Sequence, residues 1–199
     1  MKRIVLSLAA TALLGTAKAQ TGGYDIRINF KGCKDTMAYL VKYTFDQQYI
    51  SDTCKKVKNG QIVFKGTKEL ERGVYTLVSQ GKSIYFDFFI NENQKFTINT
   101  DAGNVVQNLK ATGNKENEDF FGYIKYITKK NEDFNKTREK TVGKSKEDST
   151  KFINEKIKEM NDDVKKFESD FMTRVKGSYL YDVLNLKTEK EATNVPKAS

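Results

Sequence analysis

The sequence predicts an α+β fold, with an N-terminal antiparallel β-sandwich or open barrel of about eight strands followed by an antiparallel helical hairpin. Two observations support this prediction. In the first half of the chain, apolar residues alternate with polar ones in short runs that end at turn residues, as is typical of strands. After Gly113 the apolar residues recur every three or four positions, as in amphipathic helices. The expected domains are residues 20–112 for the sheets, 113–186 for the helices and 187–199 for a linker or tail.

Residues 1–19 have the features of a secretory signal peptide. Lys2 and Arg3 form a positive start, an apolar stretch of about a dozen residues follows, and Ala17-Lys18-Ala19 is a small-x-small cleavage site. The apolar stretch is shorter than the roughly 20 residues that cross a bilayer, and no later segment is longer. We therefore expect a periplasmic or secreted protein that is cleaved near Ala19 and does not span a membrane.

Several segments have the alternation expected of strands, and the turns between them are recognisable. The expected strands are Tyr24–Phe30, Met37–Phe45, Tyr49–Lys56, Gln61–Lys65, Gly73–Ser79, Ser83–Ile90, Lys95–Asn99 and Val105–Ala111. Asn59-Gly60 predicts a hairpin between its flanking strands, because both central residues of a type I′ turn need positive φ. Asp46-Gln47-Gln48 predicts a second hairpin. The aromatic cluster from Tyr85 to Phe89 has rings on both faces of its strand, which predicts a central strand covered on its outer side by the helices.

The helical part begins after Asn114, a good N-cap followed by carboxylates in the first turn. The first helix is expected to end near Thr141. The second, from about Lys146 to Lys176, has an a/d seam with alternating steps of four and three residues. That seam consists of Ile153, Ile157, Met160, Val164, Phe167 and Phe171. Ser178 is expected to cap a short third helix that ends at Leu186.

Composition argues against several classes of function. The chain carries 35 Lys and Arg against 26 Asp and Glu, a net charge of +9 that is spread over its length. Such a mixture predicts a solvated surface and no nucleic-acid partner. Histidine is absent, which removes the usual Ser-His and Cys-His nucleophile pairs and most catalytic zinc sites. We therefore predict no catalytic, cofactor-binding or metal-binding residue and do not expect an enzyme.

The two cysteines leave three interpretations open. Cys33 and Cys54 are too far apart in sequence for a Cys-x-x-Cys redox motif. In an oxidising compartment they could form a structural disulfide, whose loop closure would stabilise the fold by ~3 kcal/mol. They could equally be two separate buried thiols, or a thiol–disulfide exchange pair whose pKa is lowered by neighbouring lysines.

Tyrosines supply a candidate interaction surface. Tyr39, Tyr43, Tyr75 and Tyr85 lie in expected strands, where their rings suit the stacking of a sugar or peptide. The same rings suit the core of a sandwich with a wet rim. Both interpretations stay open from the sequence.

A series of short segments resembles a known family. The series consists of Asp52-Thr53, the strand Lys58–Gly66 with Asn59-Gly60, Gly73-Val74-Tyr75, Phe96–Asp101 and Gly113-Asn114 followed by Phe120-Phe121. In this order it resembles the uncharacterised β-domain, with a helical extension, that precedes the thioredoxin-like or peroxiredoxin-like module of exported Bacteroidota proteins. The resemblance covers roughly Thr21 to Leu186. In those proteins a Trp-Cys-x-x-Cys module carries the thiol chemistry, and this chain has neither tryptophan nor Cys-x-x-Cys.

The resemblance implies a role without chemistry of its own. The leading hypothesis is a non-catalytic accessory or interaction domain of an exported thioredoxin-like protein. Its partner would be another protein, a second copy in a homodimer, or a C-terminal module that is missing from this chain. The alternatives are a glycan- or peptide-binding sandwich and thiol–disulfide exchange through Cys33 and Cys54.

Overall fold

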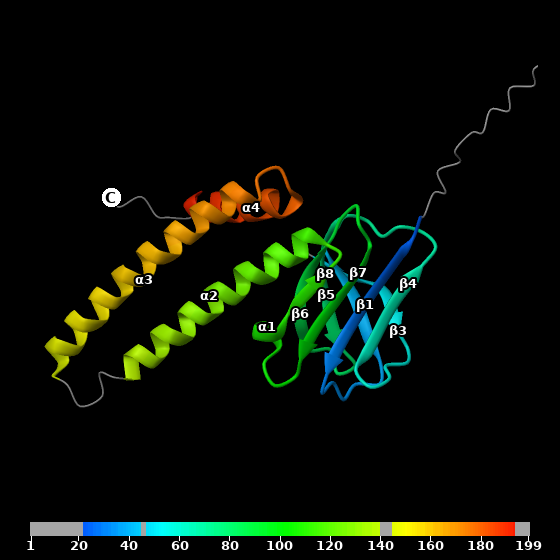
Figure 1. Ribbon diagram of the computed structural model, residues 1–199, viewed down its shortest axis with the longest axis horizontal. Coiled ribbons are helices and arrows are strands. Elements are labelled where there is room, and N and C mark those ends of the chain that lie inside the picture. Colours follow the sequence, from blue (N-terminus) through cyan, green and yellow to red (C-terminus); the bar gives the residue numbers. More distant parts are fainter. Residues whose placement is uncertain (1–21, 45–46, 140–144, 194–199) are drawn as a thin grey trace, which may run out of the picture.

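The computed structural model describes residues 22–44, 47–139 and 145–193, with side chains up to residue 186 (Figure 1). Within these residues two sheets pack face to face, and helices follow them. The predicted α+β fold is therefore confirmed, and the β-domain is a sandwich and not a closed barrel. The predicted signal peptide and its cleavage site, and the tail beyond residue 193, lie outside the described residues.

Each sheet of the sandwich contains four strands. The strands are β1 (Tyr24–Lys31), β2 (Ala38–Tyr43), β3 (Gln48–Cys54), β4 (Gln61–Gly66), β5 (Gly73–Ser79), β6 (Ile84–Ile90), β7 (Lys95–Asp101) and β8 (Lys110–Thr112). Sheet A has the order β4-β1-β7-β8, and sheet B has the order β3-β2-β5-β6. All pairs are antiparallel except β1 with β7, which run parallel. The sequence analysis expected antiparallel pairing throughout and missed this parallel pair.

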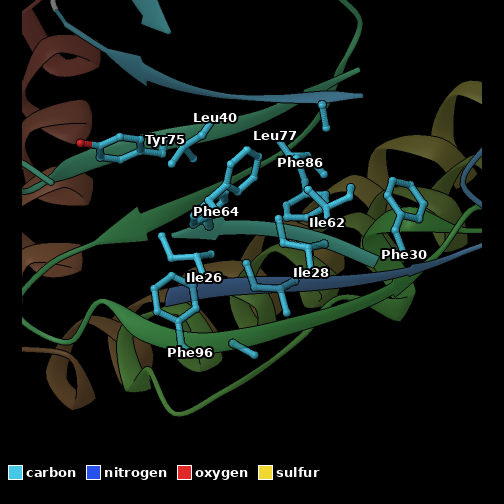
Figure 2. Packing of buried hydrophobic residues seen from close by; sticks show 14 of the residues in the cluster. Ile26, Ile28, Phe30, Leu40, Ile62, Phe64, Tyr75, Leu77, Phe86 and Phe96 are labelled. Atoms are coloured by element: carbon cyan, nitrogen blue, oxygen red, sulfur yellow. The ribbon is translucent and has the colours of Figure 1, made fainter. Parts of the chain in front are cut away.

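The core lies between the two sheets, as the alternation predicts (Figure 2). In β1, Ile26 and Ile28 are fully buried, while the alternating residues Arg27 and Asn29 are exposed. Leu40 and Leu77 of sheet B meet this face and are also fully buried. Each such side chain contributes roughly 1.5–3 kcal/mol when it leaves water, so this contact face is the main source of stability.

The Asn59-Gly60 turn forms, but it does not make the predicted hairpin. Asn59 and Gly60 have φ values of 52° and 73°, as a type I′ turn requires. However, β4 pairs with β1 of sheet A, whereas β3 lies at the edge of sheet B. The turn therefore leads the chain from one sheet to the other. It also closes on β1, because the Phe30 amide donates to the Gly60 carbonyl over 2.8 Å.

Two other predicted segments differ from the structure. The segment expected as a strand from Val105 to Ala111 begins instead with the single-turn helix α1 (Val105–Asn108), and only β8 is extended. Asn104 explains this difference, because its side chain caps the helix by accepting from the Gln107 amide. The predicted Asp46-Gln47-Gln48 turn does join an antiparallel pair, β2 and β3, although residues 45–46 lie outside the described residues.

The three long helices agree with the predicted hairpin plus a third helix. Helix α2 spans Lys115–Glu139, α3 spans Lys146–Arg174 and α4 spans Tyr179–Thr193. The predicted caps are confirmed, because Asn114 accepts from the Asn117 amide and Ser178 accepts from the Tyr181 amide. The third helix was expected to end at Leu186. It continues to Thr193 because Lys, Glu and Ala in that segment favour a helix even without apolar periodicity.

Helix α2 closes one open side of the sandwich. Strand β6 was expected in the centre of its sheet but is an edge strand, hydrogen-bonded within the sheet only to β5. The buried Asn117 side chain accepts from the Phe89 amide at 2.7 Å and donates to the Phe89 carbonyl at 2.8 Å. One amide group thus replaces a neighbouring strand and protects this edge from pairing with another chain. Phe121 of the same helix is 1% exposed and packs edge-on against Phe86.

Candidate interaction surface

The outer ends of α2 and α3 project away from the sandwich as a helical arm (Figure 1). We define the arm as residues 124–139 of α2 and 146–164 of α3. Its two helices are held together by contacts between their facing side chains. Lys130 and Asp163 form an ion pair at 2.6 Å, and nearer the sandwich the rings of Tyr126 and Phe167 stack with centroids 3.7 Å apart.

The base of the arm is fixed rigidly to the sandwich and to α4. Phe89, on the outer face of β6, packs edge-on against Phe120 of α2 and Tyr179 of α4. The Glu116 carboxylate accepts from the amide of Tyr179 at 2.7 Å and from that of Leu180 at 3.4 Å, so it caps the first turn of α4. The same carboxylate accepts from the side-chain amide of Asn91 in the loop after β6. The prediction that helices cover the outer side of this strand is confirmed at Phe89.

Burial along the seam between α2 and α3 decreases from the base outward. At the base, Phe171 is fully buried and Val175 is 4% exposed. In the arm the seam residues Phe134, Ile153 and Met160 are only partly buried, and neighbouring Ile157 is 36% exposed. Two helices alone cover each other from one side only, whereas a bundle covers an apolar stripe from several. The arm therefore presents apolar surface that a partner could cover.

A groove lies on each side of the arm seam, and charged side chains line both. A groove on one side is lined by Lys130, Asp133, Phe134, Thr137, Lys156, Glu159, Met160 and Asp163. Its charges are paired within the chain, since Lys156 contacts Glu159 at 2.5 Å and Lys130 contacts Asp163. The hydrogen bond between Lys130 and Asp163 raises the pKa of the lysine and lowers that of the carboxylate. The groove on the other side is lined by Asn135, Arg138, Glu139, Ser149, Thr150, Ile153 and Asn154.

Two of the four predicted tyrosines lie on the outer face of sheet B. Tyr39 and Tyr43 of β2 are partly buried there. Tyr43 lies near Asp87 of β6, and burial together with this carboxylate raises the tyrosine's pKa. Burial also raises the pKa of Asp87. Among the described residues, Asp87 Oδ1 is the one buried side-chain oxygen or nitrogen found without a hydrogen-bond partner.

The other two tyrosines lie on the inner face, where they fit the core interpretation that the sequence left open. Tyr75 is 1% exposed and belongs to the core cluster (Figure 2). Its hydroxyl donates to the Glu71 carbonyl at 2.7 Å. Burial raises the pKa of Tyr75 to about 12. Tyr85 packs edge-on against Phe30 with centroids 4.7 Å apart, and its hydroxyl donates to Asp35 at 2.9 Å. A register shift in the pairing of β5 with β6 lies beside Tyr85 and breaks the simple alternation.

Both cysteines are free thiols in the structure, and a disulfide between them stays a prediction. Cys54 is 8% exposed at the end of β3, and Cys33 is partly buried in the loop after β1. Thiol–disulfide exchange through this pair stays a prediction. Across the described residues, no cluster of three or more potential metal-ligating side chains was found. None of the helices in the described part combines the length and apolar character needed to cross a membrane.

The sequence analysis missed three residues that shape this surface. Asn117 and Glu116 fix the base of the arm, and Asp87 lies beside the outer tyrosines. Asp87 gave a usable signal, since it is the one charged residue in the apolar strand Ile84–Ile90. Asn117 gave only the weak signal of a poor helix former near a helix start.

Fold and surface together define an α+β protein, a β-sandwich that carries a helical arm. Residues 24–120 match the family model described as a domain of unknown function (DUF4369). The match ends inside α2, and the matched range includes Asn117, whose side chain hydrogen-bonds to the backbone of β6. Neither the curated proteins nor the solved structures gave a match to this chain. The expected uncharacterised β-domain is thus found, while its thioredoxin-like and Bacteroidota context stays a prediction.

Proposed function

We propose that this chain is an exported, non-catalytic interaction domain whose helical arm binds another protein. The single observation that carries the proposal is the contrast along the seam of α2 and α3. Phe171 at the base is fully buried, whereas Ile157 in the arm is 36% exposed. An apolar seam that stays partly exposed beyond a fixed base is what a helix-on-helix interface needs.

The rigid base supports this role energetically. Glu116, Asn117 and Phe171 fix the start of α2 to the sandwich, to α4 and to α3. Because the base of the arm is already fixed, binding of a partner costs little conformational entropy there. Such preorganisation favours affinity. The sandwich would thus hold the arm in a fixed orientation.

The wider context comes from the sequence. The signal-like segment at residues 1–19 supports export and cleavage near Ala19. The resemblance described above supports a place at the front of a thioredoxin-like protein, whose redox module would be one natural partner. In this proposal the chain positions that partner and performs no thiol chemistry itself.

A second candidate function is glycan or peptide binding on the outer face of sheet B. Its support is the pair Tyr39 and Tyr43 on that face, with the Asp87 carboxylate near Tyr43. The apolar face of a sugar or peptide could stack on a tyrosine ring there, and its hydroxyl or amide group could donate to the Asp87 carboxylate. Glycan-array binding that disappears in Tyr43→Ala and in Asp87→Ala would favour this function over the arm.

Site-specific photo-crosslinking in the producing cells tests the leading proposal. A photoreactive phenylalanine analogue replaces Ile157 in the arm, and the matched control replaces Val63, an exposed apolar residue of β4 at 44% exposure. We expect a discrete adduct from position 157 and none from position 63. The proposal fails if position 157 gives no adduct, or if both positions give the same products.

A further inference from the structure

We infer that the outer face of sheet B binds a peptide segment of another protein, and that this segment places a lysine or arginine side chain against Asp87, Tyr39 and Tyr43. The inference rests on the second candidate function and deepens it, because it selects a peptide over a glycan and names the group that is recognised. It does not depend on the helical arm, which consists of other elements.

The strand register brings side chains from all four strands of sheet B together on its outer face. Each side chain of one strand lies beside its paired residue in the next strand, so the face consists of rows that cross the sheet. One row contains Ile50, Val41, Thr76 and Asp87, and the next contains Thr53, Tyr39, Val78 and Ile84. Asp87 is the one charged residue in these two rows.

The helices cover this face at one end, where Phe89 packs edge-on against Tyr179 of α4. Away from that end, two large apolar side chains are open to solvent within the described structure. Ile50 on the edge strand β3 is 62% exposed, and Ile84 on the edge strand β6 is 55% exposed. Exposed apolar side chains on both edge strands give the face a surface that a partner can cover.

The charge of Asp87 has no counter-ion in the described part of the chain. Its side chain is partly buried, and it takes part in none of the ion pairs formed there. Burial raises the pKa of this carboxyl group, and no described lysine or arginine lies close enough to oppose the effect. A partly buried carboxylate without a cation costs stability, and such groups are typical of functional sites. A basic side chain from a partner would supply the missing charge.

Tyr39 and Tyr43 suit the same ligand. Both are partly buried on this face, and Tyr43 lies near enough to Asp87 for the carboxylate to raise the pKa of the tyrosine. The face of an aromatic ring attracts a cation, and it also packs against the aliphatic part of a lysine or arginine side chain. One basic side chain can therefore interact with a ring and with the carboxylate together.

The rest of the face favours a peptide over a glycan. A sugar has hydroxyl groups around its ring, and each one that is buried needs a hydrogen-bond partner. The face offers few of these, because most of the side chains around Asp87 are aliphatic. Thr76 beside it is fully buried, and its hydroxyl already donates to the Phe86 carbonyl. A peptide with apolar residues around one basic residue matches Ile50, Ile84 and Asp87.

Selection from a displayed library of random short peptides, on the full mature chain at neutral pH, tests the inference. We expect the peptides selected on the wild type to be enriched in lysine and arginine by at least about twofold, together with apolar residues. Asp87→Asn keeps the shape of the side chain and removes its charge, so this enrichment should disappear. The basic excess of the chain would by itself enrich acidic peptides, so enrichment of basic ones reports the local carboxylate.

Asp101→Asn is the matched control. It removes the same charge from the end of β7 in sheet A, where Asp101 pairs with Lys31, and it should leave the enrichment unchanged. Fluorescence polarisation with one selected peptide then measures the contact. Replacing the lysine of that peptide with norleucine should weaken binding to the wild type by at least about tenfold and to Asp87→Asn by less than about twofold.

Two outcomes of the selection would overturn the inference. One is a wild-type protein that selects no peptide above the blank support. The other is an equal content of lysine and arginine in the peptides selected on the wild type and on Asp87→Asn, while circular dichroism shows that both proteins are folded.

Other occupants of the face would also overturn it. Glycan-array binding that is lost in Asp87→Asn would assign the face to a sugar, so the second candidate function would stand while the inference fails. A dimer in sedimentation velocity that Asp87→Asn dissociates would assign the face to a second copy. Crosslinking from position 157 reports on the arm alone, so the leading proposal stands or fails separately.

Discussion

The side chain of Asn117 should be among the most sensitive positions of the molecule. It is fully buried, and its amide group makes both hydrogen bonds that a neighbouring strand would otherwise make to Phe89. In Asn117→Ala the Phe89 amide and carbonyl lose their partners inside the protein. Each unsatisfied buried group costs about 1–3 kcal/mol, and the void left by the side chain adds to this. We therefore expect the free energy of unfolding to fall by about 3–5 kcal/mol.

Urea denaturation followed by circular dichroism measures this loss. Asn131→Ala is the control, because it removes the same atoms from an exposed position of the same helix. At low protein concentration it should change the free energy of unfolding by less than about 0.5 kcal/mol. Hydrogen exchange of the Phe89 amide should accelerate in Asn117→Ala and not in the control. Equal stability of the two variants would refute the role assigned to this side chain.

A conservative variant tests the same hydrogen bonds through pH. Asn117→Asp keeps the shape of the side chain but replaces the donor to the Phe89 carbonyl with an oxygen. Burial should raise the pKa of the new carboxyl group in the folded state above its value in the unfolded state. The folded state then binds the proton more tightly, so the deficit relative to wild type should shrink as pH falls from neutral towards about pH 4. A deficit that is constant or grows over this range would contradict the reasoning.

The remaining predictions concern a turn, a buried carboxylate and the two thiols. Gly60→Ala should lower the free energy of unfolding by at least about 2 kcal/mol, because φ is +73° and the new Cβ would lie 2.0 Å from the Phe30 carbonyl oxygen. Gly122→Ala is the control, because Gly122 is an exposed helical position where a new Cβ meets open space, so this variant should raise the free energy of unfolding. Urea denaturation compares the two variants, and a Gly60→Ala protein more stable than Gly122→Ala would contradict this account. Burial raises the pKa of Asp87 above its ordinary 3.8, so its contribution to stability is lost as pH rises through the folded-state pKa. Asp87→Asn removes the charge that is disfavoured by burial, so it should raise the free energy of unfolding at neutral pH and make that free energy depend less on pH. A lower free energy of unfolding at neutral pH would contradict this reasoning. Maleimide labelling followed by mass spectrometry should modify the partly buried Cys33 before the buried Cys54, whereas a native mass lower by two hydrogens would reveal a disulfide.

Much of the local structure was predictable because it depends on neighbours in the chain. The alternation of Ile26 and Ile28 with polar residues defined the inner face of β1, and the structure confirms it. Asn114 and Ser178 were recognisable as caps, since capping needs only a side-chain oxygen within three residues of the amide it accepts. Asn59-Gly60 was recognisable as a turn because few other pairs tolerate two positive φ angles.

The interaction surface was less predictable, because burial of a side chain depends on what lies opposite it. Tyr39 and Tyr75 looked equivalent in the sequence, yet one lies on the outer face and the other is 1% exposed in the core. The decrease in burial along the arm could be recognised only once α2 and α3 were placed side by side, with Asn135 next to Thr150 and Asn154.

By itself, the sequence determined the order and type of most elements in this protein, from the alternating strands through the heptad seam of the helices. Only the tertiary structure decided which elements are partners: the parallel pairing of β1 with β7, the transfer of β4 to sheet A and the closure of the β6 edge by Asn117. The reason is physical. Local propensity arises among residues a few positions apart, whereas strand partners are selected by apolar burial and backbone hydrogen bonding between segments distant in the chain, such as the Asn117–Phe89 contact across 28 positions.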